Sequence, residues 1–347
     1  MATVYADSAL SSQVSLDDAA QVPAPVETAD KAAPVTGNAQ PPHPIVAKLG
    51  EHGKALIAPM LGILVFLGLW AVLAPQVETS LGALPGPVEV FSQGGALLEE
   101  WQASQQAKAD FSAAQEGRIA AGTQAQAFEY SGPPTFIDQI GTSLMTVALG
   151  FILATVVAVP IGLVCGLSPK VNAAINPLVQ IMKPVSPLAW LPIVTMVVSA
   201  TITSNDSILA KSFVISAVVV MLCSMWPTLI NTAVGTASID KDLLNVGRVL
   251  RLGWFAKLTR LVLPSSLPYI FTGMRLSLGV GWMVLIAAEM LAQNPGLGKF
   301  VWDEFQNGSS QSLARIMFAV IVIGMIGFLL DRLMMGLESI ANRNHTI

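Results

Sequence analysis

Long apolar runs alternate with short polar segments along the chain from about residue 55 onward. Six of these runs reach the roughly 20 residues that an α-helix needs to cross the hydrocarbon layer of a membrane. They cover approximately residues 55–74, 139–167, 174–200, 209–235, 265–292 and 313–336. The pattern predicts an all-α integral membrane protein with six transmembrane helices, in a membrane domain over residues 55–340.

The third run differs from the others because it contains four prolines, at Pro177, Pro184, Pro187 and Pro192. Proline lacks a backbone N–H and clashes with the preceding turn of a helix. We therefore expect this span to be kinked or broken. A membrane tolerates such a break only where protein or a cavity satisfies the freed backbone groups.

Composition supports a membrane protein, since only 12% of the residues are charged, against about 25% in a soluble domain. Residues 1–50 are rich in Ala, Pro and Val without sustained periodicity, so we expect a disordered tail there. The first 30 residues have neither a basic start nor an apolar core, and a signal peptide is not predicted.

The distribution of Lys and Arg predicts the orientation. The connection over 75–138 holds only Lys108 and Arg118, both far from its ends. The connection between the fourth and fifth spans instead holds five cations, Lys241, Arg248, Arg251, Lys257 and Arg260. By the positive-inside rule the first connection is an extracytoplasmic loop and the second is cytoplasmic. Six spans then place both termini in the cytoplasm.

The cytoplasmic segment over 238–264 is basic and amphipathic. Apolar residues recur at helical spacing, at Ile239, Leu243, Val246 and Leu250. Polar residues occupy another face, at Lys241, Asn245 and Arg248. From the residues alone, two interpretations remain open: a helix-turn-helix fixed to the bundle, or a loop on anionic lipid headgroups.

The ends of the first of these helices have recognisable signals. Ser238 is expected to cap its start, and Gly253 to end it in a left-handed conformation. A second short helix would carry Phe255, Leu258 and Leu261 on one side.

Among the charged residues within the predicted spans, Lys183, Arg275 and Glu289 are candidates for a functional role. Such charges are costly and usually face the bundle interior or a wet cavity. Arg275 and Glu289 are separated by about 20 Å along one helix, so they cannot pair with each other.

The sequence contains no catalytic or metal-binding constellation. Its two cysteines, Cys165 and Cys223, lie inside apolar runs, and no Cys/His cluster has metal-ligand spacing. No phosphate-binding loop of the Gly-x-x-x-x-Gly-Lys-Ser/Thr type is present either. If the protein uses ATP, another subunit must bind it.

The segment over 238–264 resembles the cytoplasmic motif of bacterial ABC importer permeases: Glu-Ala-Ala, three residues, Gly, nine residues, Ile-x-Leu-Pro. The matching positions are Asn245, Val246 and Gly247 for Glu-Ala-Ala, Arg251 for Gly, and Leu261, Leu263 and Pro264 for the end. The spacing agrees, whereas the acid and the Gly are replaced.

Three further stretches resemble the nitrate/bicarbonate/sulfonate group of these permeases, and most of all its nitrate/nitrite branch. They are "KPVSPLAWLPI" from Lys183, "PYIFTGMRLSLGVGWMVLIAAEML" from Pro268 and "GLGKFVWDEF" from Gly296. The resemblance covers roughly residues 55–340 and implies a fold like that of type I ABC importer permeases.

The resemblance implies that the 238–264 segment is a coupling element that docks on a separate ATPase. The residues assigned to this role are Leu243, Asn245, Val246, Gly247, Leu250, Arg251, Gly253, Leu263 and Pro264. ATP and Mg²⁺ would be bound by that partner, so no cofactor is expected in this chain.

The other implied partners are a second permease subunit, expected as a homodimer, a periplasmic or lipid-anchored substrate-binding protein, and membrane lipid. No nucleic acid is expected. The implied location is the bacterial inner membrane. The external stretch "LPGPVEVFSQGGALLEEW" from Leu84 is either a contact for the binding protein or a surface cap.

Nitrate or nitrite is the cargo that the resemblance favours, and a cationic path would suit such an anion because arginine recognises oxyanions in forked geometry. The candidate path residues are Arg275, Lys183, Trp190, Trp282 and Glu289. The alternatives are structural: a Lys183 side chain that reaches the interface, an Arg275 ion pair with a neighbouring helix, a Glu289 structural contact and aromatic core packing.

Two rival functions remain. The same architecture could carry bicarbonate, cyanate or an alkanesulfonate. A secondary transporter or channel would work without an ATPase, and its usual signature is inverted internal repeats. A membrane enzyme is the least favoured class.

Overall fold

The computed structural model of the protein describes residues 44–79, 82–122, 128, 130–202, 210–309 and 311–343. Residues 1–43, most of the tail expected to be disordered, lie outside this description. The chain divides into two units, Met1–Met60 and Leu61–Ile347. Helix α1 (Pro44–Leu73) begins in the first unit and continues into the second, so it starts within the range expected for the tail.

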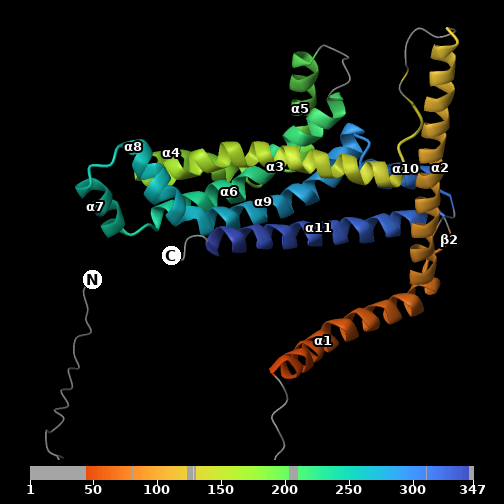
Figure 1. Cartoon of the computed structure of the whole chain (residues 1–347), viewed down its shortest axis with the longest axis horizontal. Helices are drawn as coiled ribbons and strands as arrows, with labels where there is room; N and C mark the ends of the chain where they lie inside the picture. Colours follow the sequence, from red (N-terminus) through yellow and green to blue (C-terminus); the bar gives the residue numbers. More distant parts are fainter. Residues whose placement is uncertain are drawn as a thin grey trace, which may run out of the picture. The chain divides into compact units, whose positions relative to one another are not determined.

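The second unit is almost entirely helical (Figure 1). After α1 its elements are η1 (Ala74–Gln76), β1 (Glu78–Thr79), β2 (Gly82–Ala83), α2 (Pro87–Ala120), α3 (Phe136–Leu167), α4 (Pro169–Met182), α5 (Pro187–Thr201), α6 (Lys211–Ala237), α7 (Lys241–Val249), α8 (Trp254–Lys257), η2 (Leu258–Val262), α9 (Leu263–Ala292), α10 (Leu297–Asn307) and α11 (Ser312–Arg343). The two short strands pair antiparallel, with Glu78 opposite Ala83.

Among the described residues, five helices are long and apolar enough to cross a membrane. They are Ile57–Gln76, Phe136–Leu167, Lys211–Ala237, Trp254–Ala292 and Ser312–Ala341. The helices α4 and α5, whose axes differ by 102°, add a sixth span if the bent pair is counted as one. The membrane fold predicted from the apolar pattern is confirmed, and the third span is broken where its prolines cluster.

The centre of the bundle is α6, which packs against both α3 and α9. Small residues allow this close packing: a Cβ at Gly150 of α3 would lie 2.7 Å from Val220, and one at Gly162 would lie 2.6 Å from Thr232. Between α6 and α9, the hydroxyls of Thr228 and Ser277 lie 2.7 Å apart. Close backbones and interhelical hydrogen bonds are the usual means of joining helices in lipid, where apolar burial gives little driving force.

The connection over 75–138 contains a helix, α2, that the apolar pattern did not predict. It is polar around most of its circumference but rich in Ala, Gln and Glu, which favour helix. It packs against α11 and α3. A Cβ at Gly94 would lie 2.8 Å from the Phe318 ring, and Lys108 approaches Asp138 at 3.5 Å.

The start of α7 differs from the prediction. Asp240, not Ser238, caps this helix, and its side chain accepts a hydrogen bond of 2.9 Å from the Asp242 N–H. Ser238 instead ends α6 and donates to the Gly235 carbonyl. Because α6 continues through Ala237, the next extended residue that carries an acceptor is Asp240, whose charge also suits the positive end of a helix.

The end of α7 also differs. The left-handed residue is Arg251, with φ 49°, whereas Gly253 is extended and precedes α8. The Leu252 N–H bonds to the Gly247 carbonyl, and the Arg251 N–H bonds to the Arg248 carbonyl. These bonds form a Schellman motif, in which the residue just after the helix end is left-handed. In this chain that residue is Arg251, two positions before Gly253. The prediction that Gly253 ends α7 in a left-handed conformation was therefore wrong.

The second short helix is also not separate. One turn of α8 runs through the π-helical turn η2 into α9. The expected helix-turn-helix is thus a short helix joined to the extended inner end of a span.

Candidate functional site

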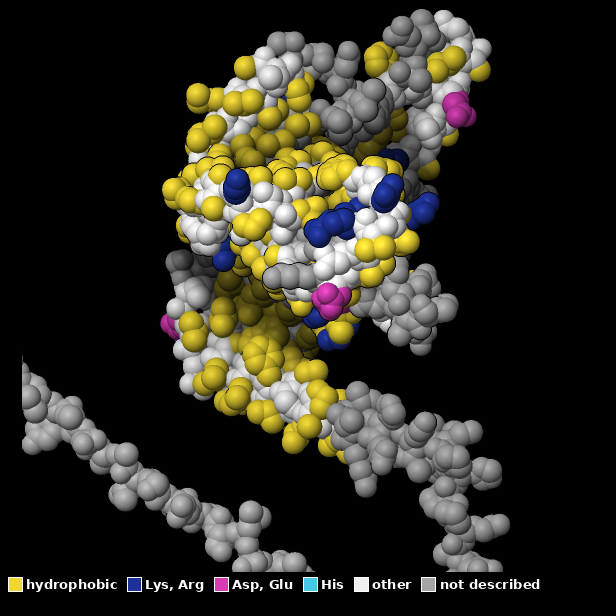
Figure 2. Space-filling model, turned by 90° about the vertical axis from the view of Figure 1, so that its left-hand side faces the viewer, with side chains coloured by type: hydrophobic (Ala, Val, Ile, Leu, Met, Phe, Trp, Pro, Cys, Tyr) yellow, Lys and Arg dark blue, Asp and Glu magenta, His cyan; other side chains and the backbone are white. Residues whose placement is uncertain are grey.

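Hydrophobic side chains are exposed on α7 and the adjoining α8. The exposed fractions are 50% for Val246, 82% for Val249, 64% for Leu250, 68% for Trp254 and 71% for Phe255. We call these five residues the α7 surface. Figure 2 views the end of the molecule to which α7 and α8 belong, where hydrophobic side chains adjoin those of Lys and Arg. An apolar centre beside charged side chains is the anatomy of a protein-docking surface.

A glycine allows α7 to pack closely against the bundle. A Cβ at Gly247 would lie 2.7 Å from Cδ1 of Leu261, so this position keeps α7 close to η2. Leu263 and Pro264 lie half-buried in the first turn of α9, and Leu243 is also half-buried. These residues support the surface rather than form it.

The polar side of α7 carries Asn245 and Arg248, whose side chains share a hydrogen bond of 3.2 Å. Both residues are exposed, as is Arg251 at the Schellman turn. The coupling residues predicted from the sequence therefore divide into exposed positions and supporting positions.

Arg275 of α9 pairs with Asp331 of α11. Its Nε lies 2.5 Å from Oδ1 and its Nη2 lies 3.1 Å from Oδ2. This contact is the structural alternative considered for Arg275, an ion pair with a neighbouring helix. Asp331 was missed at the sequence level, although its position inside the sixth apolar run marks it as a charge within a span.

A cavity of about 230 Å³ adjoins this ion pair. Its lining includes Arg275, Asp331, Gly279, Gly327 and Trp282. The indole of Trp282 is 6% exposed and donates a hydrogen bond of 3.0 Å to the Ile323 carbonyl. Two of the predicted path residues, Arg275 and Trp282, are thus brought together.

Glu289 is fully buried where α3, α9 and α10 meet. The Ser143 hydroxyl lies 2.8 and 2.9 Å from the two carboxyl oxygens, and the Gly298 N–H donates at 3.0 Å. The Leu297 N–H donates to Ser143 at 2.9 Å. These contacts attach the start of α10 to the other two helices, which favours the structural interpretation of Glu289.

The remaining path candidates lie elsewhere. Lys183 is exposed at the end of α4, at the break in the third span. Trp190 is half-buried in α5, and its Nε1 has no hydrogen-bond partner among the described residues. Neither residue lines the cavity beside Arg275.

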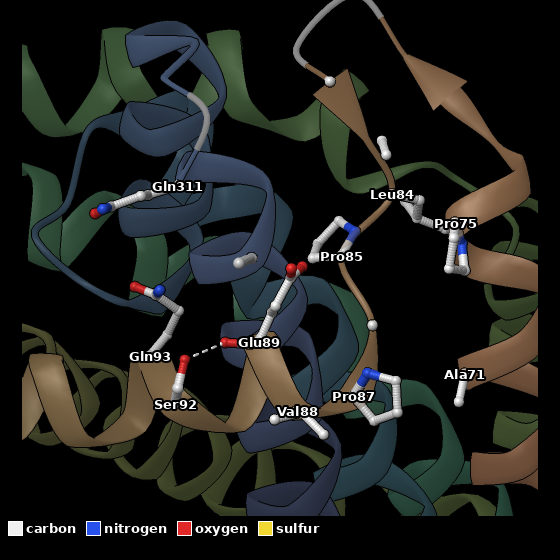
Figure 3. A pocket seen from close by; sticks show the side chains of 14 residues that line it. Ala71, Pro75, Leu84, Pro85, Pro87, Val88, Glu89, Ser92, Gln93 and Gln311 are labelled. Atoms are coloured by element: carbon white, nitrogen blue, oxygen red, sulfur yellow. Dashed lines mark hydrogen bonds between the residues drawn. The ribbon is translucent and has the colours of Figure 1, made fainter.

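A larger cavity, of about 710 Å³, lies beside the start of α2 (Figure 3). Pro85, Val88 and Glu89 from the external stretch line it, together with Gln311 near α11. The Ser92 hydroxyl donates to the Glu89 carbonyl at 2.7 Å. Farther along the stretch, Glu100 pairs with Arg315 of α11. The stretch therefore covers part of the bundle and also borders an open cavity.

Within the described part of the chain, no group of three or more His, Cys, Asp or Glu side chains could hold a metal ion.

Comparison with known protein families gives a match over residues 158–339, to the family described as "Binding-protein-dependent transport system inner membrane component". The chain belongs to this family. The match includes α7, Arg275, Glu289 and Asp331, whereas α2 and the external stretch precede it.

Curated relatives cover most of this permease. A nitrate import permease protein of Leptolyngbya laminosa is 30% identical over 309 residues, 88% of this chain and 95% of that protein. A bicarbonate transport system permease protein of Synechococcus elongatus is 34% identical over 302 residues, 83% of this chain and 90% of that protein. Because the relatives are transport permeases, the chain is a translocation subunit.

A third relative, the taurine transport system permease protein of Escherichia coli, is 30% identical over 218 residues, 61% of this chain and 73% of that protein. A solved structure of inward-facing conformations of the MetNI methionine ABC transporter aligns with a TM-score of 0.49 at 13% identity. It covers 59% of this chain and 95% of that chain.

Proposed function

We propose that this permease carries nitrate or nitrite across the bacterial inner membrane, as one of two identical membrane subunits of an ATP-driven importer. The support is the similarity to nitrate import permeases over most of the chain. Bicarbonate is a second candidate because permeases named for it are similarly related. Nitrate and bicarbonate are both planar anions with three oxygens on one central atom.

The observation that carries an ATP-driven mechanism is the α7 surface. Removing a Val, Leu or Phe side chain fully from water is worth about 1.5–3 kcal/mol, and five large side chains here are at least half exposed. We infer that a groove on a separate ATPase covers them. That partner binds ATP and Mg²⁺, and its closure draws the two α7 helices together and changes the arrangement of the spans.

The orientation belongs to the same proposal. The α7 surface faces the cytoplasm, and α2 with the cavity at its start faces the opposite side, where a substrate-binding protein would approach. Both termini are then cytoplasmic, as the Lys and Arg distribution predicts.

The cargo is tested by uptake in cells that lack their own anion importers and express the permease with its ATPase and binding protein. Nitrate, nitrite, bicarbonate, cyanate and taurine are supplied one at a time. We expect ATP-dependent uptake of nitrate or nitrite. Uptake of bicarbonate alone would establish the second candidate and contradict the first.

The docking role is tested with Val246→Asp. An unpaired charge at a buried interface costs several kcal/mol, and each 1.4 kcal/mol lowers affinity tenfold. The ATPase should therefore fail to co-purify. Arg248→Ala, on the polar side of the same helix, should retain the ATPase. Equal recovery of the ATPase with both variants would show that α7 does not dock there.

A further inference from the structure

The Arg275–Asp331 contact has the geometry of a planar oxyanion site. Two N–H groups on one edge of the guanidinium approach the two oxygens of one carboxylate, at 2.5 and 3.1 Å. Forked contacts of this kind are specific for two oxygens held in a plane on one atom. Nitrate and bicarbonate offer the same pair of oxygens, so either can replace the carboxylate without a change in the arginine.

The pair lies deep within the membrane-spanning helices. Arg275 is 12 residues from the start of α9, about 18 Å at 1.5 Å per residue. Asp331 lies 19 residues from the start of α11. Charges at such depth persist where they face a wet cavity or another protein surface. Here 39% of the Arg275 side chain and 35% of the Asp331 side chain are exposed in the single chain.

Two cavities give access to the pair. The first, of about 230 Å³, includes Trp282 and Gly327 in its lining. The second, of about 600 Å³, includes Thr272 and Met283. Both include Arg275, Asp331 and Gly279, and a Cβ at Gly279 would meet no atom of the described residues within 4 Å. Each space is far larger than the roughly 30 Å³ that one water molecule occupies in the liquid, so a four-atom oxyanion fits beside the arginine.

We propose that the Arg275 guanidinium is a binding site for the planar oxyanion cargo, and that the Asp331 carboxylate occupies this site when cargo is absent. The inference rests on the proposed function for the class of cargo. An arginine without a partner at this depth is costly, so the carboxylate satisfies it between transport events. Competition from the carboxylate also weakens cargo binding, and weak binding suits a carrier that must release its cargo.

The test uses the purified permease–ATPase complex without its binding protein, and sodium nitrate as the probe. In Asp331→Asn the competing carboxylate is gone. We expect this variant to bind nitrate about tenfold more tightly than the wild type in calorimetry. Its melting temperature should also rise with nitrate but not with sodium chloride at the same ionic strength. Adding Arg275→Gln to Asp331→Asn should abolish both effects.

A matched control is Asp303→Asn, which removes the carboxylate from another ion pair, with Lys299 at 2.5 Å on α10. This variant should respond to nitrate as the wild type does, since lysine has no fork. If Asp331→Asn assembles poorly, purification in sodium nitrate should restore the complex because nitrate takes the place of the missing carboxylate.

Three results would overturn the inference: nitrate binding by Asp331→Asn no tighter than by the wild type, an equal response in the double variant, or poor assembly that nitrate does not restore. Wild-type uptake separates this failure from failure of the proposed function. If the wild type imports nitrate while one of these results holds, the Arg275 site is wrong and the function stands. If the wild type imports only bicarbonate, the nitrate proposal fails, and sodium bicarbonate becomes the probe that decides the site.

Discussion

Replacing Ser143 with Ala should destabilise the permease strongly, because this one hydroxyl serves two buried groups. It donates to the Glu289 carboxyl at 2.8 Å and accepts from the Leu297 N–H at 2.9 Å. Leaving a buried polar group without its partner costs about 1–3 kcal/mol, so two such groups cost about 2–6 kcal/mol. With a shift of about 2–4 °C per kcal/mol for domains of 150–250 residues, a loss of ~4 kcal/mol lowers the Tm by roughly 8–16 °C.

Ser216→Ala is the matched control. Ser216 is fully buried in α6, but its hydroxyl has no hydrogen-bond partner among the described residues. Removing it should leave the Tm unchanged or raise it, since no partner is left unsatisfied. The assay is thermal unfolding of the two variants in the same detergent. An equal fall in Tm for both variants, or no fall for Ser143→Ala, would refute the assigned role of the Glu289 contacts.

Three further predictions concern separate features. Arg251→Val should lower stability by about 1–2 kcal/mol because a β-branched residue is strained at positive φ, whereas Arg251→Gly should not; equal Tm values would contradict this. Gly150→Ala should lower the Tm, since its Cβ would meet Val220, whereas the Cβ of Gly141→Ala on the same helix meets no atom of the described part of the chain within 4 Å and should raise it. A reversed order of the two Tm values would contradict the close contact of α3 with α6 at Gly150. In intact cells, an impermeant thiol reagent should label Gly117→Cys but not Thr259→Cys, and labelling of the second would reverse the orientation.

The features predicted correctly from the sequence depend on patterns local to the chain. A helix that crosses a membrane needs a continuous apolar run whatever its neighbours are, so the spans were recognisable. The break in the third span was recognisable too, because Pro184 and Pro187 act on their own backbone. The residues that favour helix in α2 are also a local signal. The helix was not predicted because it is polar, and spans were assigned only to apolar runs.

The errors arise where two local signals compete. Both Ser238 and Asp240 are good helix caps, and the length of α6 decides between them. Gly253 is the residue that ordinarily adopts a left-handed conformation, yet the hydrogen bonds of the turn place Arg251 there. Arg251 stands at the position where the cytoplasmic motif of ABC importer permeases has Gly. The motif alignment therefore pointed to a left-handed residue at this position, but an arginine there does not suggest one.

The sequence could not predict which distant residues are the hydrogen-bond and ion-pair partners of the charged residues inside the spans. The alternative of an ion pair for Arg275 was considered, but the partner, Asp331, is 56 residues away on another helix. Glu289 likewise meets Ser143 across 146 residues. Such pairs depend on how α3, α9, α10 and α11 pack against one another. The hydrophobic periodicity within a single helix does not predict that packing.

Whether this permease is part of an ATP-driven nitrate importer can be measured as nitrate accumulation in liposomes that contain the purified permease. Three preparations are compared: the permease alone, the permease with its ATPase, and the two together with the binding protein and ATP. We expect accumulation only in the last preparation, in step with ATP hydrolysis. Nitrate entry through the permease alone, without ATP, would contradict it and identify a secondary transporter or channel.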